Sequence, residues 1–104
     1  MRSADFRKVY DNGFRLSGPL FAAFCLARTS SGEGVRLGLT VPRAIGKAVV
    51  RNRIKRRLRE AFRKHRAEFG AHWDIVLNPR RAALNAPFTE LELALKRVIQ
   101  KCGT

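Results

Sequence analysis

Residues 43–66 read RAIGKAVVRNRIKRRLREAFRKHR, and this stretch says most about the fold. Its apolar side chains recur at steps of three and four residues, the spacing of one face of an α-helix. These side chains are Val50, Ile54, Leu58, Ala61 and Phe62. The pattern predicts a long helix whose apolar face packs against the rest of the protein.

The same stretch is strongly basic. Eleven of its residues are Lys or Arg and one is Glu, in a chain of 104 residues with 22 Lys and Arg, 8 Asp and Glu, and a net charge of +14. Because the apolar face anchors the helix, the rest of its circumference presents cations to solvent. A positive patch of this size indicates a polyanionic partner, with nucleic acid ahead of an anionic membrane.

Two strand patterns flank this helix. Residues 35–41 alternate, with apolar side chains at odd positions and small or polar ones at even positions. Residues 73–77, WDIVL, are typical of a short buried strand. A strand, a helix and a strand in succession predict a crossover unit that pairs two parallel strands.

The remaining segments complete a single α+β domain over residues 1–104. The hydrophobic fraction of 45% is ordinary for a folded protein. Apolar spacing and turn residues predict a helix at 3–10, strands at 14–16 and 20–27, a hairpin loop at 30–34 and a final helix at 87–101. The expected order is helix, three strands, helix, strand, helix.

Membrane and secreted classes do not fit the sequence. No apolar stretch approaches the roughly 18 residues of a membrane span, and the first residues lack the apolar centre of a signal peptide. Cys25 and Cys102 have no metal-ligand or disulfide-framework spacing. We interpret Cys25 as a core residue and Cys102 as a tail residue, in a cytoplasmic protein without a membrane partner.

The sequence contains more residues suited to binding a polyanion than residues suited to catalysis. His65 and His72 have no Ser or Cys nucleophile motif nearby, the acids are scattered, and no phosphate-binding Gly-rich loop or metal-ligand cluster occurs. We expect no catalytic residue, no cofactor or metal bound by the protein, and no small-molecule substrate. Arginine forks suit phosphate, and rings such as Phe6, Tyr10 and Phe24 could either stack on unpaired bases or pack in the core.

The basic helix sits within a longer family pattern. Residues 45–63, IGKAVVRNRIKRRLREAFR, resemble the signature of the bacterial ribonuclease P protein subunit. Residues 5–10, DFRKVY, with Gly13, resemble its first helix, and residues 37–41, LGLTV, resemble the strand before the signature. Residues 74–77, DIVL, followed by Pro79 and Arg80, resemble its last strand, so that the resemblance spans essentially the whole chain.

The resemblance implies a role in an RNA-based enzyme. Ribonuclease P removes the 5′ leader of precursor tRNA by metal-dependent hydrolysis, and the active site with its Mg²⁺ belongs to a catalytic RNA. The implied partners are therefore ribonuclease P RNA and precursor tRNA, with one protein for each RNA subunit. The family also implies that the strand–helix–strand crossover is left-handed, against the usual right-handed rule.

The resemblance further implies two sets of site residues. Contacts with the catalytic RNA would come from Lys47, Arg51, Asn52, Arg53, Lys55, Arg56, Arg59 and Arg63. A cleft for the precursor leader would be lined by Phe6, Arg7, Tyr10 and Phe24.

The positive charge is also compatible with a second hypothesis, in which the protein is a stand-alone basic RNA-binding module of ribosomal or architectural type. Such a module needs neither the GKAV lead-in at residues 46–49 nor the aromatic pair Phe6 and Tyr10. These two features favour the ribonuclease P subunit, and a cleavage assay with a catalytic RNA separates the two readings.

Overall fold

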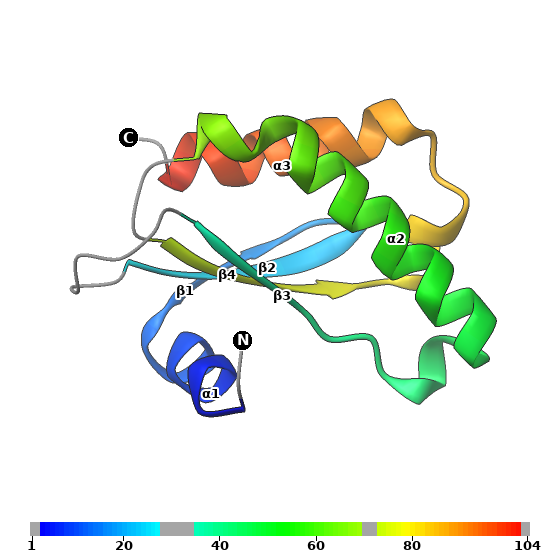
Figure 1. Cartoon of the computed structure of the whole chain (residues 1–104), viewed down its shortest axis with the longest axis horizontal. Coiled ribbons are helices and arrows are strands. Elements are labelled where there is room, and N and C mark those ends of the chain that lie inside the picture. Colours follow the sequence, from blue (N-terminus) through cyan, green and yellow to red (C-terminus); the bar gives the residue numbers. More distant parts are fainter. Residues whose placement is uncertain (1–2, 28–34, 70–72, 103–104) are drawn as a thin grey trace.

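The computed structural model describes residues 3–27, 35–69 and 73–102. A four-stranded sheet carries two long helices on one face and a short helix on the other (Figure 1). The elements are α1 (Ser3–Asn12), β1 (Phe14–Ser17), β2 (Phe21–Ala27), β3 (Arg36–Leu39), α2 (Ala48–His65), β4 (Trp73–Pro79) and α3 (Phe88–Cys102), with short 3-10 turns η1 (Arg43–Ile45), η2 (Arg66–Glu68) and η3 (Arg81–Leu84). The predicted order of helices and strands is confirmed.

The sheet order is β1-β2-β4-β3. β4 pairs antiparallel with β2 and parallel with β3, which confirms the predicted parallel pair. The predicted hairpin loop at 30–34 lies outside the described residues, but the strands on either side of it are not neighbours, because β4 lies between them. The hairpin interpretation is therefore wrong. Apolar alternation within a segment identifies a strand, but it does not determine which other strand lies beside it in the sheet.

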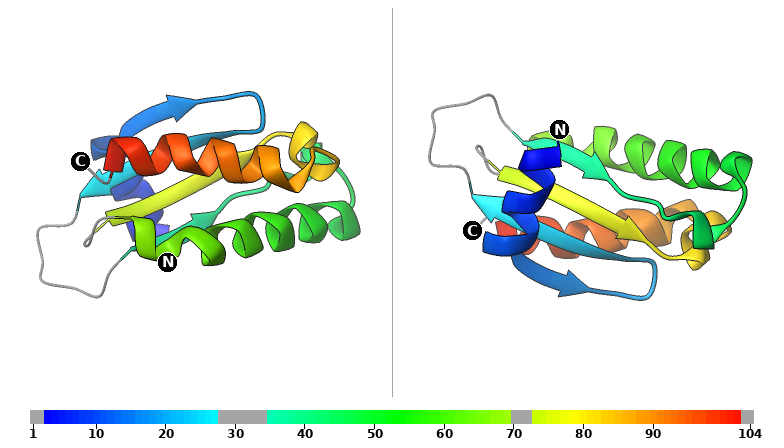
Figure 2. Two further views of the ribbon diagram at one scale, coloured as in Figure 1. Left: turned by 90° about the horizontal axis from the view of Figure 1, so that it is seen from above. Right: turned by 90° about the horizontal axis from the view of Figure 1, so that it is seen from below.

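The connection from β3 through α2 to β4 has the hand that the resemblance implied. Figure 2 (left) looks down on the helices, with β3 and β4 running in the same direction beneath the layer of α2 and α3. When these strands are turned to point upward in that view, β4 lies to the left of β3. The crossover is thus left-handed, whereas most such connections are right-handed.

The main core lies between the sheet and the pair α2 and α3. Ile54 and Leu58 of α2 and Leu91 and Leu95 of α3 are completely buried there. Burial of one such side chain contributes about 1.5–3 kcal/mol to folding. The apolar face predicted for the basic helix is therefore the face that holds it on the sheet. No helix among the described residues is long and apolar enough to span a membrane.

The two cysteines meet inside this core. Cys25 of β2 is completely buried, as predicted, and Cys102 is 4% exposed at the end of α3. The interpretation of Cys102 as a tail residue is wrong, because α3 runs one residue further than expected and packs its last turn on β2. A hydrogen bond with Cys102, together with burial, raises the pKa of the Cys25 thiol, so it stays protonated.

α1 is fixed on the other face of the sheet at two points. Gly13 lets the end of α1 approach β2 closely, since a Cβ there would lie 2.6 Å from the carbonyl oxygens of Cys25 and Val9. Arg36 of β3 donates two hydrogen bonds of 2.7 Å to the buried carboxylate of Asp74, and its Nη2 also lies 3.6 Å from Asp5 of α1. These contacts place Tyr10, near the end of α1, over the sheet.

Arg57 is a structural cation. The sequence places it among the exposed cations of the basic helix, yet it is half-buried, and its Nη1 donates to the carbonyl oxygens of Ala83 and Leu84 at 2.6 and 2.9 Å. Its Nη2 donates to the carbonyl of Ala86. One side chain of α2 thereby holds η3 and the chain that leads into α3.

We expect Arg57→Met to destabilise the fold by about 1–3 kcal/mol, because three carbonyls lose a charged donor while the aliphatic stem is kept. Arg53→Met is the matched control: Arg53 is exposed and makes no hydrogen bond to the described residues, so its effect should stay within about 0.5 kcal/mol. Urea unfolding measures both variants. Equal effects would contradict the structural role of Arg57.

His65 links α2 to α3. Its Nε2 lies 2.7 Å from the Glu92 carboxylate, its Nδ1 contacts Glu68, and its side chain is only 13% exposed. Hydrogen bonds to Glu92 and then Glu68 raise the pKa of His65. Because the pKa of His65 is higher in the folded protein than in the unfolded chain, protonation of His65 stabilises the fold. This stabilisation is fully present below the unfolded pKa of about 6.5, and it is lost as the pH rises through the folded-state pKa.

His65→Gln should therefore destabilise the protein more at pH 5.5 than at pH 9. Unfolding free energies of the variant and the wild type, measured by urea titration at both pH values, give the difference. Glu92→Gln should likewise destabilise the protein more at pH 5.5 than at pH 9, because it removes the carboxylate that contributes most to the raised pKa of His65. A gap between variant and wild type that widens with rising pH would contradict this assignment.

Candidate nucleic-acid interface

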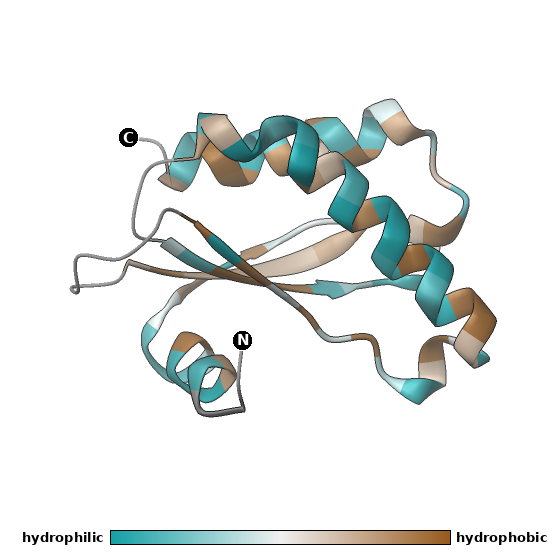
Figure 3. Ribbon diagram, in the orientation of Figure 1, coloured by the Kyte–Doolittle hydropathy of each residue, from teal (hydrophilic) through white to brown (hydrophobic). Residues whose placement is uncertain are grey.

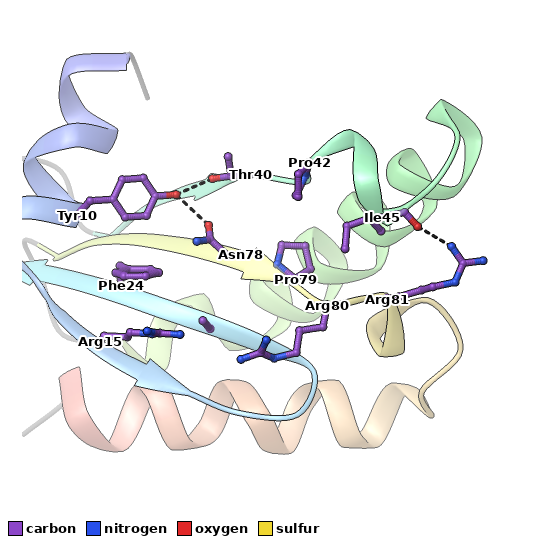
Figure 4. A pocket seen from close by; sticks show the side chains of 11 residues that line it. Tyr10, Arg15, Phe24, Thr40, Pro42, Ile45, Asn78, Pro79, Arg80 and Arg81 are labelled. Carbon is purple, nitrogen blue, oxygen red and sulfur yellow. Dashed lines mark hydrogen bonds between the residues drawn. The ribbon is translucent and has the colours of Figure 1, made fainter.

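A cleft of about 540 Å³ opens on the α1 face of the sheet (Figure 4). Its floor comes from β2 and β4, and its walls come from α1, β1, η1 and the segments that follow β3 and β4. The floor residues Ala22 and Phe24 alternate along β2 with the core residues Ala23 and Cys25, so they point away from α2 and α3. The cleft and the main core thus use opposite faces of the same strands.

Tyr10 and Phe24 form the aromatic part of the cleft. Their rings meet edge to face, with centroids 4.8 Å apart. The Tyr10 hydroxyl donates to Oδ1 of Asn78 at 2.9 Å and accepts from Oγ1 of Thr40 at 3.0 Å. Tyr10 nevertheless remains 37% exposed. The two hydrogen bonds fix its ring while leaving part of it available for stacking on a base.

Three arginines line the same cleft. The guanidinium of Arg15 lies 5.8 Å from the centroid of the Phe24 ring, and Arg80 and Arg81 stand where β4 ends. The sequence-based site missed all three. The alternation of Arg15 with Leu16, which packs against the core, was the available signal for the first; nothing in the sequence placed the other two in the cleft.

The other two residues predicted for the cleft lie outside its lining. Phe6 is half-buried and Arg7 is exposed, both on α1 about one turn before Tyr10. The structure thus brings Tyr10 and Phe24 together and leaves Phe6 and Arg7 beside the cleft, nearer the start of α1. Their role stays a prediction.

The exposed side of α2 forms a separate basic surface. A groove of about 350 Å³ is lined by Asn52, Lys55, Arg56, Arg59, Glu60 and Arg63. Arg63 pairs with Glu60 at 2.6 Å. Figure 3 shows much of the α2 ribbon coloured as hydrophilic, interrupted by its apolar residues. Five of the eight residues predicted to contact the catalytic RNA therefore share one groove, which we call the α2 groove.

The other three predicted residues lie in the first half of α2 or immediately before it. Arg53 lines a neighbouring hollow of about 370 Å³ together with Val49, which is 77% exposed. Lys47 is exposed immediately before α2. Arg51 is half-buried, and its Nε donates to the Gly46 carbonyl at 3.1 Å, so part of its hydrogen-bonding capacity is used within the protein.

The start of α2 is continuous with a wall of the cleft. Ile45 lines the cleft, and Gly46 follows it. The φ angle of Gly46 is 156°, a backbone conformation that residues with a side chain rarely adopt. Arg81 donates from Nη1 to the Ile45 carbonyl at 2.5 Å. A few residues thus connect the cleft with the α2 groove.

Both surfaces are suited to binding RNA. Guanidinium groups donate paired hydrogen bonds to phosphate, and rings stack on unpaired bases without reading their sequence. No group of three or more His, Cys, Asp or Glu side chains that could hold a metal ion occurs among the described residues, and His72 lies outside them. The chemistry that these surfaces support is the positioning of a polyanion.

The known proteins whose sequences resemble this chain are ribonuclease P protein components. Residues 1–103 match the family model described as Ribonuclease P. The ribonuclease P protein component of Maridesulfovibrio salexigens is 42% identical over 99% of this chain and 82% of its own length. That of Brucella melitensis biotype 1 is 41% identical over 98% of this chain and 77% of its own.

Solved structures agree with the sequence matches. The ribonuclease P protein from Thermotoga maritima superposes with a TM-score of 0.84 at 27% identity, covering 97% of this chain and 94% of that one. The match includes the strands and helices that build the cleft and the α2 groove. This chain therefore belongs to the bacterial ribonuclease P protein family, the protein component of the ribonucleoprotein endoribonuclease that matures the 5′ ends of tRNA.

Proposed function

We propose that the two basic surfaces bind two different RNAs. The α2 groove, with Lys47, Arg51 and Arg53 beside it, contacts the catalytic RNA, and the cleft holds the unpaired 5′ leader of precursor tRNA. The observation that supports this division is the lining of the two surfaces. The cleft offers Tyr10 and Phe24 beside three arginines, whereas the α2 groove offers four cations, an amide and the Glu60 carboxylate, without an aromatic ring.

The chemistry of each surface supports its assigned RNA. A folded RNA presents closely spaced phosphates, and a helix with arginines on its exposed side can contact several of them at once. A single-stranded leader presents unpaired bases, which can stack on Tyr10 and Phe24 while Arg15, Arg80 and Arg81 contact its phosphates. The leader is thus held by contacts that tolerate many sequences.

The protein's contribution to cleavage is then electrostatic and positional. Contacts on both surfaces neutralise phosphates where the two RNAs approach each other, which lowers their mutual repulsion. We propose that the Mg²⁺ ions of the reaction are held by the RNA subunit. The described residues of the protein offer no cluster of ligands for such an ion, and no step is assigned to one on the protein.

The proposed complex contains one protein and one catalytic RNA, with precursor tRNA as the substrate and no small-molecule substrate. Since the two surfaces lie on the same small domain, one copy can contact both RNAs. The curated relatives are bacterial, and precursor tRNA is processed in the bacterial cytoplasm, where we place the protein.

Reconstitution tests the proposal. Purified protein, a ribonuclease P RNA and precursor tRNA are combined at low Mg²⁺, and cleavage at the mature 5′ end is followed. We expect cleavage with protein and RNA together, much slower cleavage with RNA alone, and none with protein alone. A basic protein of similar size and charge replaces the chain as the control.

The alternative, a stand-alone basic RNA-binding module, gives a different result. Such a module would bind the catalytic RNA and precursor tRNA with similar salt dependence and would leave the cleavage rate no higher than the control protein does. Failure to stimulate any ribonuclease P RNA would favour this alternative and contradict the proposed function.

A further inference from the structure

Two consecutive arginines at the end of β4 reach opposite walls of the cleft. Arg80 donates from Nε to the Gly18 carbonyl at 2.9 Å and from Nη2 to Oγ of Ser17 at 3.1 Å, at the turn between β1 and β2. Arg81 donates from Nη1 to the Ile45 carbonyl of η1 at 2.5 Å. Figure 4 shows the two side chains pointing in different directions from the same edge of the cleft.

Both arginines start from an anchored backbone. The Arg80 amide donates to the Leu20 carbonyl at 2.8 Å, and the Ala83 amide donates to the Arg80 carbonyl at 3.0 Å. η3, which begins at Arg81, is held on α2 by Arg57. The β1–β2 turn and η1 are therefore each attached by an arginine to one short, fixed segment between them.

We infer that Arg80 and Arg81 are positioning residues that set the spacing of the two cleft walls. Through these hydrogen bonds they keep Phe24 and Tyr10 accessible between the walls for unpaired nucleotides. This inference rests on the proposed role of the cleft in holding the leader. It goes beyond a role as phosphate-binding cations, because the attachment to the walls matters in addition to the charge.

The two arginines differ in what the attachment requires. Arg80 uses two nitrogens of its planar fork to reach two acceptors on the same turn, which a lysine cannot reproduce. Arg81 reaches one carbonyl through one nitrogen, which a lysine can reproduce. Arg80→Lys should therefore lose the attachment and Arg81→Lys should keep it, although both variants keep the charge.

Ser17 gives a test that leaves the cleft lining unchanged. It is exposed, it lies outside the lining of the cleft, and its hydroxyl accepts from Arg80. Ser17→Ala removes one acceptor without altering any charge or any ring in the cleft. An effect of Ser17→Ala on leader binding would have to pass through the position of Arg80.

The experiment measures the affinity of the reconstituted complex for leader-bearing precursor tRNA and for mature tRNA. The wild type is compared with Arg80→Lys, Arg80→Gln, Arg81→Lys and Ser17→Ala. We expect the preference for the leader-bearing precursor to fall about three- to tenfold for Ser17→Ala and Arg80→Lys and to stay within twofold for Arg81→Lys, a range that matches the net contribution of one typical hydrogen bond.

Salt dependence separates attachment from charge. The slope of log affinity against log salt should stay at the wild-type value in Ser17→Ala and Arg80→Lys, since no cation is lost. It should fall by about 0.7 in Arg80→Gln if that arginine also contacts a phosphate of the single strand. Wild-type leader preference in both Ser17→Ala and Arg80→Lys, with a loss in Arg80→Gln, would overturn the inference and leave Arg80 as a cation only.

Phe24→Ala, measured in parallel, identifies which proposal fails. If Phe24→Ala reduces the leader preference while Ser17→Ala and Arg80→Lys do not, the cleft binds the leader and the wall attachment is irrelevant. If Phe24→Ala also leaves the preference unchanged, the cleft is not the leader site and the proposed function itself is contradicted. Thermal unfolding of each variant confirms that the compared proteins are folded.

Discussion

Replacement of Arg53, Arg56 and Arg59 by Gln is expected to weaken binding of the catalytic RNA and to flatten its salt dependence. All three side chains are exposed on α2, and none has a hydrogen-bond partner among the described residues. Each phosphate contact that is lost should lower the slope of log affinity against log salt by about 0.7–0.9. The triple variant should therefore lose roughly two units of slope, as measured by filter binding between 50 and 200 mM salt.

A matched triple variant on α3 controls for net charge. Lys96, Arg97 and Lys101 are exposed on α3, so their replacement by Gln removes the same charge from another surface. We expect this variant to keep most of the slope. Equal losses from α2 and α3 would mean that the catalytic RNA responds to total charge, and the assignment of the α2 groove would be wrong.

Phe24→Ala should cause the largest selective effect on the substrate. Phe24 lies on the cleft floor, with the Tyr10 ring 4.8 Å away and the Arg15 guanidinium 5.8 Å away. Stacking of one base on an aromatic ring contributes about 1–3 kcal/mol. The affinity for leader-bearing precursor should fall about 5- to 150-fold relative to mature tRNA, as measured by equilibrium binding to the reconstituted complex.

Phe14→Ala is the aromatic control. Phe14 is also a strand phenylalanine and is 39% exposed, but it pairs with Trp73 rather than with the residues of the cleft. Its removal should change the affinities for leader-bearing and mature tRNA by similar small factors. If Phe24→Ala weakens both RNAs equally, the substitution acts through the fold, and the assignment of Phe24 to the leader is contradicted.

Local patterns in the sequence were enough to predict the elements of the fold. The repeat of Val50, Ile54 and Leu58 identified α2 and its buried face, because helical spacing and burial are coupled within one segment. The alternation at residues 35–41 likewise predicts a strand, and β3 spans Arg36–Leu39 with Leu37 and Leu39 packed against the core. The neighbours of β3 could not be predicted in this way, since strand order depends on contacts between distant segments.

Contacts between distant segments also explain why the roles of some site residues could not be predicted from the sequence. Arg57 looks like every other cation on α2, and only the approach of η3 turns it into a structural residue. Arg80 and Arg81 follow the end of a strand, where the chain could simply face solvent, and only the β1–β2 turn and η1 make them part of a cleft. The burial of Cys102 could not be predicted from the sequence for the same reason, because it depends on the docking of the last turn of α3 on β2.

Crosslinking tests most directly whether the two surfaces of this domain contact different RNAs. A photoreactive benzoyl-phenylalanine replaces Tyr10 in the cleft, Arg59 in the α2 groove, or Leu93, which is 57% exposed on α3. In the reconstituted complex we predict crosslinks from position 10 to the precursor leader, from position 59 to the catalytic RNA, and from position 93 to neither. Crosslinks from position 10 to the catalytic RNA alone, or from position 59 to the leader, would contradict the division of the two surfaces.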